Sequence, residues 1–266
     1  NKMGNIIVIL YAIQIFINCS AFTLTVISGN LFDYILSLGL GYLFLFAIIL
    51  VYHRHLAHRA YEIKYFRFPL VFLASMALQG PPRKWVITHK IHHKECDTRD
   101  DPHTPLKSTF HAFSSGIFDK TSHNIRFKYK RMILETFKYT EGIEYDILDT
   151  YYFEIIISMS ILLYSTFGID CIIVWYSGAF ITLVQAGLVN AFCHETSSIQ
   201  TIGGCHAINN IMLWPFLLGA NWHKNHHDNP KRINLQKKWY EIDLHYAVYK
   251  VFERIGICTK KRARSL

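Results

Sequence analysis

Long apolar runs dominate the pattern of hydrophobic and polar positions along the chain. Four such runs, at residues 6–27, 31–52, 153–167 and 171–193, contain few charged side chains. A helix that crosses a bilayer needs about 20 mostly apolar residues, so the runs predict four membrane spans. We expect the first run to stay in the membrane, because no short apolar core with a small-residue cleavage site marks it as a signal peptide.

The remaining segments, 53–150 and 194–266, are mostly polar and predict a helical cap beside the membrane. Two apolar pieces within them, residues 66–78 and 208–218, are too short to cross a bilayer. We interpret both pieces as interfacial or re-entrant segments.

A stripe of apolar residues at helical spacing predicts an amphipathic helix near the C-terminus, formed by Leu244, Val248, Val251 and Ile255. Such a helix packs on the cap or lies on the membrane, and packing is favoured. The fold class expected for the single domain 1–266 is therefore an all-α integral membrane protein, with four transmembrane helices and a helical cap.

The basic residues are distributed unevenly. The chain has 28 Lys and Arg and a formal net charge of +9, and every basic residue except Lys2 lies in segments 54–138 and 224–264. An excess of Lys and Arg marks the cytoplasmic side of a membrane protein, so we expect a cytosolic cap and both termini in the cytosol. This distribution does not suggest a nucleic-acid-binding patch. The basic run Arg126, Lys128, Lys130 and Arg131 is expected to be solvated surface that can also contact anionic lipid headgroups.

Six cysteines form no CxxC pair, and three of them lie in apolar runs: Cys19, Cys96, Cys171, Cys193, Cys205 and Cys258. We therefore expect neither a disulfide framework nor a thiolate zinc site, but reduced and mostly structural thiols.

Two histidine-rich motifs share one spacing. WVITHKIHHKECDTRDDPH places His89, His92 and His93 at i, i+3 and i+4, and WHKNHHDNP repeats the pattern with His223, His226 and His227. On a helix this spacing points three imidazoles to one side, and neutral imidazole is the commonest metal-binding side chain. A solvated histidine-rich turn is the alternative for either motif alone.

Further polar residues follow the second and fourth apolar runs. His53 and His58, in HRHLAHR, would lie about 140° apart on an α-helix. This separation predicts that they do not share a face, and that they serve different metals or lie where the helix breaks. Asn190 and His194 are i and i+4, and polar groups at membrane depth are functional candidates. A hydrogen bond between packed helices is the alternative for this pair.

With four spans, every histidine cluster lies on the same side of the membrane, so nine imidazoles can converge. One zinc takes four ligands and one b-type haem takes two, so nine predict two metals with four or five ligands each. Imidazole ligands suit iron, copper, nickel or zinc and do not decide among them.

Three motifs also resemble those of a known family. HRHLAH, HKIHH and HKNHH are similar, in order and in position relative to the spans, to the histidine boxes of the integral-membrane fatty acyl desaturases. The resemblance is closest to the acyl-CoA branch of the stearoyl-CoA, delta-9 type, and the third box with its WYEID tail is similar to bacterial and plant-type members. The chain departs from the family pattern at Gly219-Ala220-Asn221 and at Ala207-Ile208, which puts the identity of the substrate in doubt more than metal binding.

The resemblance implies a di-iron centre that reduces O2 with two external electrons and removes two hydrogens from adjacent methylenes of a fatty acyl chain. It implies two ferrous ions held by nine histidines, with Asn190 acting through a bound water: His53, His58, His89, His92, His93, His194, His223, His226 and His227. The implied partners are acyl-CoA or another acyl carrier, O2, membrane lipids and an external electron donor of the cytochrome b5 or ferredoxin type.

Three residues before the second box, Arg83, Lys84 and Trp85, are expected to dock the acyl donor or the electron donor, and anchoring to anionic headgroups is the alternative. Hydroxylation, triple-bond formation or an acyl-lipid, alkane or sterol substrate remain alternatives at the same metal centre. A haem- or metal-binding membrane protein and an inactive member of the family are further alternatives. We expect a bacterial inner membrane in preference to the endoplasmic reticulum.

Overall fold

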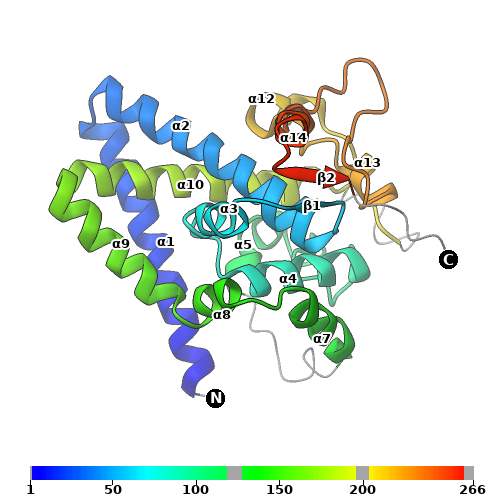
Figure 1. Cartoon of the computed structure of the whole chain (residues 1–266), viewed down its shortest axis with the longest axis horizontal. Coiled ribbons are helices and arrows are strands. Elements are labelled where there is room, and N and C mark those ends of the chain that lie inside the picture. The colour runs from blue at the N-terminus through cyan, green and yellow to red at the C-terminus, as the bar shows by residue number, and fades with distance from the viewer. Residues whose placement is uncertain (1, 119–127, 196–203, 261–266) are drawn as a thin grey trace.

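The computed structural model describes residues 2–118, 128–195 and 204–260. Its longest helices are α1 (Lys2–Ser28), α2 (Leu31–Ala47), α9 (Tyr152–Phe167) and α10 (Ile169–Phe192). In Figure 1 these helices occupy one side of the molecule and the shorter elements gather on the other. Their outward side chains are large and apolar, which suits lipid and not water: Phe16 is 73% exposed, Ile27 78% and Leu31 74%.

Three helical segments are long and apolar enough to cross a membrane, Ile6–Ser28, Leu31–Ala57 and Ile169–Phe192. They match the first, second and fourth predicted spans, although the second continues beyond its expected end at residue 52. The predicted span at 153–167 is α9, which has 16 residues. Together with α8 (Ile143–Thr150) it makes a pair bent by 83°, which raises the count to four if the pair is one span.

Close contact between α2 and α10 fixes the base of the cap. A Cβ atom on Gly178 would lie 2.7 Å from the Cβ of Leu40, so a larger residue would push the helices apart. The Thr182 hydroxyl donates to the carbonyl of Gly41 at 2.9 Å. Small residues and hydroxyl groups commonly allow such close packing between membrane helices. As a result, the C-terminal ends of the second and fourth predicted spans lie at a fixed separation.

The cap consists of short elements. They are η1 (Ile48–Ala57), α3 (Arg67–Ser75), α4 (Pro82–Glu95), α5 (Thr109–Phe118), α7 (Lys130–Tyr139), α8, η2 (Ile211–Leu213), α12 (Trp214–Leu217), α13 (His223–Asp228) and α14 (Leu244–Arg254). Strands β1 (Tyr61–Ile63) and β2 (Cys258–Lys260) pair antiparallel, with Tyr61 opposite Lys260. This small sheet is an addition to the expected all-α fold. It attaches the segment after α14 to the segment after η1.

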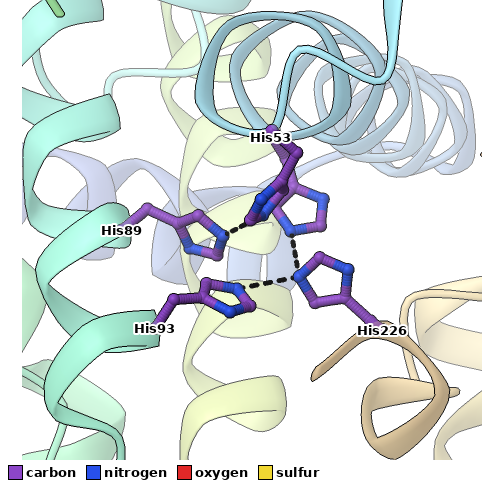
Figure 2. A group of neighbouring side chains, drawn as sticks. His53, His89, His93 and His226 are labelled. Atoms are coloured by element: carbon purple, nitrogen blue, oxygen red, sulfur yellow. Dashed lines mark hydrogen bonds between the residues drawn. The ribbon is translucent and has the colours of Figure 1, made fainter. Parts of the chain in front are cut away.

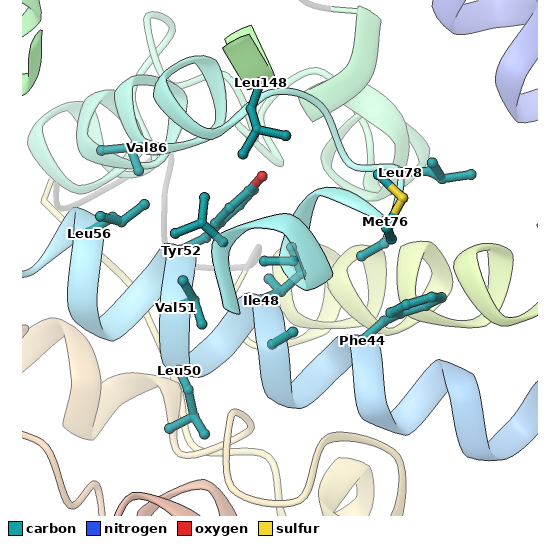
Figure 3. Packing of buried hydrophobic residues seen from close by; sticks show 14 of the residues in the cluster. Phe44, Ile48, Leu50, Val51, Tyr52, Leu56, Met76, Leu78, Val86 and Leu148 are labelled. Atoms are coloured by element: carbon teal, nitrogen blue, oxygen red, sulfur yellow. The ribbon is translucent and has the colours of Figure 1, made fainter. Parts of the chain in front are cut away.

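The apolar core lies between η1, α3, α4 and α8. Tyr52, Leu56, Val86 and Leu148 are each at most 2% exposed, and Figure 3 shows this part of the cluster. The Tyr52 hydroxyl lies 2.7 Å from that of Ser75, so this buried phenol is paired. Burial of these side chains holds η1 beside α4 through the hydrophobic effect, and both elements carry histidines.

The predicted stripe on α14 is only partly buried. Val248 packs against the core, whereas Val251 and Ile255 are 56% and 63% exposed. Asp243 caps the helix by accepting the Tyr246 N–H, and it also binds Arg54 of η1. This anchor fixes the rotation of α14, so that the buried His245 and Tyr249 face the core and the end of the stripe does not.

Three predictions concern residues outside the described ranges: the location of the N-terminal Asn1, the location of the C-terminal Leu266, and the surface role of Arg126 in the basic run. Lys128 pairs with Glu95 and Asp100, and Arg131 pairs with Glu135 on the exposed face of α7.

Candidate metal centre

Five histidines from three elements converge in what we name the first histidine group: His53, His58, His89, His93 and His226. One ring nitrogen of each lies within 4.8 Å of the others. The Nε2 atom of His226 is 2.9 Å from that of His53 and 2.9 Å from that of His93. Figure 2 shows these imidazoles pointing toward one another from η1, α4 and α13.

The prediction that His53 and His58 do not share a face is wrong, and the backbone gives the reason. Residues Ile48–Ala57 form a π-helix, in which the His58 N–H donates to the carbonyl of His53 at 3.0 Å. Hydrogen bonds from i to i+5 widen the turn, so residues five apart lie nearly above one another. The two ring centroids are 4.7 Å apart as a consequence.

Four further histidines form the second histidine group: His92, His194, His223 and His227. His223 lies at its centre, with its Nε2 atom 3.1 Å from that of His194 and 3.0 Å from that of His227. The ring of His92 lies 5.1 Å from those of His194 and His227. All nine expected histidines therefore lie in one of two neighbouring groups.

Each histidine-rich motif contributes to both groups. On α4, His89 and His93 belong to the first group, whereas His92 faces the second. On α13, His226 belongs to the first group, and His223 and His227 belong to the second. Helices α4 and α13 therefore lie between two sites, and each supplies histidines to both. The i, i+3, i+4 spacing alone indicated one shared face and not this division.

Two buried carboxylates orient the second group. Asp101 accepts from the Nδ1 atom of His92 at 3.0 Å, and Asp97 lies 3.2 Å from the Nδ1 atom of His194. Burial alone raises the pKa of Asp101, but the adjacent His92 lowers it below its ordinary value overall. The Nε2 atom of His92 is buried without a hydrogen-bond partner among the described residues. A neutral imidazole held by a carboxylate at one nitrogen is well prepared to bind a metal ion with the other.

Histidine spacing gave no indication that Asp97 and Asp101 belong to the site. Both lie in the CDTRDDPH stretch that follows the second histidine box. Acidic residues within one or two turns of clustered histidines were the available signal, since metal-binding histidines usually donate to a carboxylate.

The expectation of reduced thiols is wrong for one pair of cysteines. Cys96 and Cys205, 109 positions apart, form a disulfide. Cys96 ends α4, and Cys205 lies just before the bridge between Ala207 and His194, so the fold brings them together. Sequence spacing could not indicate this pairing. The other four cysteines are free thiols, as expected.

Burial keeps six of these histidines neutral. Burial and then neighbouring imidazoles lower the pKa of His89, His93 and His226 well below the ordinary value of 6.5. Burial lowers the pKa of His58 to about 3, with Lys90 contributing. The pKa values of His223 and His227 are lowered by the same causes. Neutral imidazoles carry the lone pair that metal binding requires.

Arg83 has a structural environment that does not fit the expected docking role. It is 5% exposed, and its guanidinium donates to Thr140 and binds Asp146 and Asp149. These contacts attach α4 to α7 and α8. We therefore assign Arg83 to the positioning of α4 and not to partner binding.

Lys84 and Trp85 lie at a cavity beside the histidines. The Lys84 ammonium is 3.6 Å from the centre of the Tyr11 ring. The indole of Trp85 stacks on His89 with centroids 5.1 Å apart, and its Nε1–H donates to Gln79. Asn190 also lines this cavity. Its role through a bound water stays a prediction.

The cavity contacts both histidine groups. His53, His89 and His226 of the first group and His92 and His223 of the second line it. The apolar part of its lining comes from α2, η1, α5 and α10: Leu45, Ile48, Ile49, Phe113, Leu183, Ala186 and Val189. An apolar chain in this cavity would lie against both groups at once.

Polar networks hold α13 in place. Asn225 donates to Glu241 at 2.9 Å and to the carbonyl of Leu235, and its own N–H donates to Asn209. Glu241 is 2% exposed and also accepts the backbone N–H groups of Lys237 and Lys238. The WYEID segment therefore acts as a clamp for the third histidine box, a role that the sequence analysis did not assign.

The two departures from the family motifs have defined positions. Gly219 has a φ of +123° and lies so close to Asp243 that a Cβ atom would be 2.8 Å from it, so glycine is required there. Ala220 lines the cavity with a methyl group. Ala207 pairs with His194 in an isolated bridge, and the Ile208 N–H donates to the carbonyl of Cys193. These departures therefore lie in the cavity wall and in the backbone behind His194, and both histidine groups are complete beside them.

Comparisons with known proteins agree with this geometry. The family model for fatty acid desaturases matches residues 31–254. A chloroplastic palmitoyl-monogalactosyldiacylglycerol delta-7 desaturase of Arabidopsis thaliana is 30% identical over 218 residues, which cover 81% of this chain and 58% of that protein. The chain thus spans less than two thirds of the length of that relative.

Two other relatives have different substrates in their names. An acyl-CoA 5-desaturase of Anemone leveillei is 29% identical over 232 residues, 83% of this chain and 68% of its own length. A delta-9 acyl-lipid desaturase of Arabidopsis thaliana is 28% identical over 215 residues, 80% of this chain and 69% of its own length. Because the matched region covers most of the chain and includes all nine histidines, the chain belongs to the fatty acid desaturase family.

Proposed function

We propose that the chain is a di-iron fatty acyl desaturase, in which each histidine group holds one iron. The observation that carries the proposal is the single cavity lined by both histidine groups and by apolar side chains of α2 and α10. The donor sets fit the metal, because the imidazoles are buried and neutral and converge through their Nε2 atoms. Bound there, iron would supply the activation of O2 with two external electrons.

The residues of the chain position the substrate. The apolar wall between η1 and α10 would hold the alkyl chain by burial of its methylenes. The cavity is deep enough in the protein for its histidines to be mostly buried, which excludes bulk water from the reacting carbons. Lys84 and Trp85 also line this cavity, where a cation and an indole could contact the polar end of an acyl donor.

We propose acyl-CoA as the acyl donor, with delta-9-like selectivity, and an acyl lipid as the alternative. The relatives include both acyl-CoA and acyl-lipid desaturases, so similarity supports the reaction more than the carrier. A membrane hydroxylase with the same centre is a further alternative. The electron donor we propose is an external protein of the cytochrome b5 or ferredoxin type.

The proposed topology places the cap in the cytosol. The unequal distribution of Lys and Arg supports this orientation. Both termini would then be cytosolic, and the turns near Asn30 and Asp170 would face the other side. A bacterial inner membrane stays the predicted location.

Expression in a desaturase-deficient host, with mass spectrometry and double-bond mapping of the lipids, tests the function. We expect products about 2 mass units lighter than the saturated chain, and none from a His92→Ala variant. Products about 16 units heavier would indicate hydroxylation instead. Purified protein with a Soret band and no non-haem iron would overturn the proposal in favour of a haem protein.

A further inference from the structure

The segment that begins with α13 concentrates positive charge beside the metal centre. Residues 224–240 contain five basic residues and one acidic residue, Asp228. Lys224 and Lys237 lie 3.8 Å and 2.7 Å from the Asp228 carboxylate, so two lysines share this acid. Two further lysines of the segment are exposed, and so is the tryptophan that follows them. We name these five residues the lysine surface: Lys224, Lys231, Lys237, Lys238 and Trp239.

A second basic stretch of the cap, around α7, is largely neutralised by acids. Lys128, just before α7, pairs with Glu95 and Asp100. Arg131 pairs with Glu135 on the helix itself. Figure 1 shows α7 and α13 in separate parts of the cap. An acidic protein that approaches the cap is therefore attracted more strongly toward α13 than toward α7.

Aromatic rings connect the lysine surface with the second histidine group. Trp239 is 87% exposed, and its ring centroid lies 5.6 Å from that of Tyr240. The Tyr240 ring is in turn 6.4 Å from that of Trp222, which is buried and directly precedes His223 in the chain. The rate of electron transfer through a protein falls steeply with distance. A donor on this surface would therefore deliver electrons over a short path.

The lysine surface is also fixed to the helix that carries the histidines. The Glu241 carboxylate accepts the backbone N–H groups of Lys237 and Lys238, and it binds the Asn225 amide of α13. A partner that binds the exposed lysines is thereby held at a defined position relative to the histidines of α13. Because the backbone is already ordered, docking loses little conformational entropy.

The exposed side chains favour a protein partner over the membrane. The lipid-facing sides of α1 and α2 expose many large apolar residues, such as Ile27 and Leu31. In residues 224–240 the exposed side chains are charged or polar, apart from the aromatic Trp239 and Tyr240. Tryptophan is enriched among the few residues that carry most of the binding energy of protein interfaces. A charged surface around one exposed tryptophan therefore fits a protein better than a lipid layer.

We propose that the external electron donor docks on the lysine surface, and that this donor is a small acidic protein with a one-electron redox group. The proposal rests on the proposed function, because it assumes a reaction that draws electrons from outside the chain. In that reaction O2 takes two hydrogen atoms from the acyl chain, two electrons from the donor and two protons from solvent, and is reduced to two molecules of water.

A one-electron donor must dock twice for each double bond formed, so its binding must be fast and reversible. Electrostatic steering meets this requirement, because complementary charges raise the association rate more than they slow dissociation. Interfaces between redox partners are accordingly small and weak. A patch of four lysines around one tryptophan has the size that such an encounter needs.

The test measures donor binding to the metal-free full chain in detergent, so it does not depend on iron. The probes are the soluble domain of cytochrome b5 and a plant-type ferredoxin, both acidic, at low and high salt. We expect Lys231→Glu with Lys238→Glu to weaken binding about 10-fold or more at low salt, and this loss to shrink as salt screens the charges. Trp239→Ala should weaken binding about 10-fold at either salt concentration, because it removes an apolar contact.

A matched control reverses the same amount of charge elsewhere on the cap. Lys130→Glu with Lys138→Glu changes two exposed lysines of α7 and should alter donor binding by less than about twofold, because distant charges are screened. A second measurement mixes the iron-loaded chain with reduced donor or with dithionite. Donor should reduce the Lys231 and Lys238 double variant more slowly than the natural chain. Dithionite, which needs no docking surface, should reduce both at the same rate.

Equal weakening by the two pairs of charge reversals would overturn the proposal, because only the net charge of the cap would then matter. So would the absence of salt-dependent binding of both probes to the natural chain. A water-soluble amine reagent provides the test for a lipid contact, and it should label Lys231 and Lys238 both in detergent and in vesicles that contain phosphatidylglycerol. Labelling in detergent alone would mean that the lysine surface lies on the membrane, and the docking proposal would fail.

This proposal and the proposed function can fail separately. If the charge reversals act on donor binding as expected but the chain desaturates no lipid in the host, only the proposed function fails. If lipids are desaturated and the two pairs of reversals are equivalent, only the docking proposal fails.

Discussion

The two histidine groups share α4 and α13 but are oriented by different means. In the first group the backbone sets the spacing, since a π-helix brings His53 and His58 together. Trp85 also supports this group by stacking on His89. In the second group the imidazoles are oriented by side chains, because Asp97, Asp101 and the cysteine pair lie behind them. The first group should therefore respond to changes in helical register, and the second to changes in the charge of the two carboxylates.

The largest expected effect comes from removing one ligand from each group. His226→Ala should lose the iron of the first group and His92→Ala that of the second, so each variant should hold about one iron per chain. Desaturation should fall below detection in both, because the reaction needs both metals. Metal analysis and lipid analysis measure these outcomes, with His111→Ala in α5 as a control outside both groups. Active protein that contains one zinc and no iron would contradict the assignment.

A change of register tests the π-helix. Moving the second histidine of the first box by one position, with Ala57→His and His58→Ala together, gives the i, i+4 spacing of an ordinary α-helix. We expect this double variant to lose the first iron as completely as His58→Ala alone, because the π-helix aligns residues five apart. The second iron should remain, which would show that the fold persists. Retention of both irons would mean that the π-helix does not determine the first group.

Neutralising the carboxylates should affect only the second group. Asp97→Asn and Asp101→Asn should each lower iron affinity there by about 10–100-fold and leave the first group unchanged. Asp100→Asn is a matched control, because Asp100 lies between them in sequence but pairs with Lys128 at the surface. Iron titration of each variant gives the affinities. Equal effects at both groups would contradict the distinction drawn between them.

The last expected effect comes from mild acid and concerns stability, not iron content. The pKa values of His58, His89, His93 and His226 are lowered in the folded chain, so these groups stay neutral when the unfolded chain takes up protons below its pKa of 6.5. The free energy of unfolding is therefore unaffected by these groups above about pH 7. Below about pH 6, each such histidine lowers it by about 1.4 kcal/mol for every pH unit. Thermal unfolding of the metal-free protein between pH 7.5 and 5.5 should show this loss. An unfolding temperature that rises on acidification would be inconsistent with buried neutral imidazoles.

Much of the molecule is determined by local features of the sequence. The apolar runs predicted three segments able to cross the membrane because length and hydrophobicity decide the preference for lipid. The third run gave α9, whose length of 16 residues leaves its span dependent on α8. The nine histidines were found because their spacing repeats, and all of them lie in the two groups.

The tertiary structure decided how these parts are used. The assignment of each histidine to a group depends on α4 and α13 lying between two sites. The spacing of histidines along a helix does not indicate which other elements pack on each side of that helix. The π-helix, the buried network of Arg83 and the pairing of Cys96 with Cys205 also depend on distant segments. A one-dimensional pattern records how often side chains recur along the chain, whereas packing determines which distant elements they meet. For this reason the sequence specified the candidate metal-binding residues, and only the fold divided them into two groups with different supports.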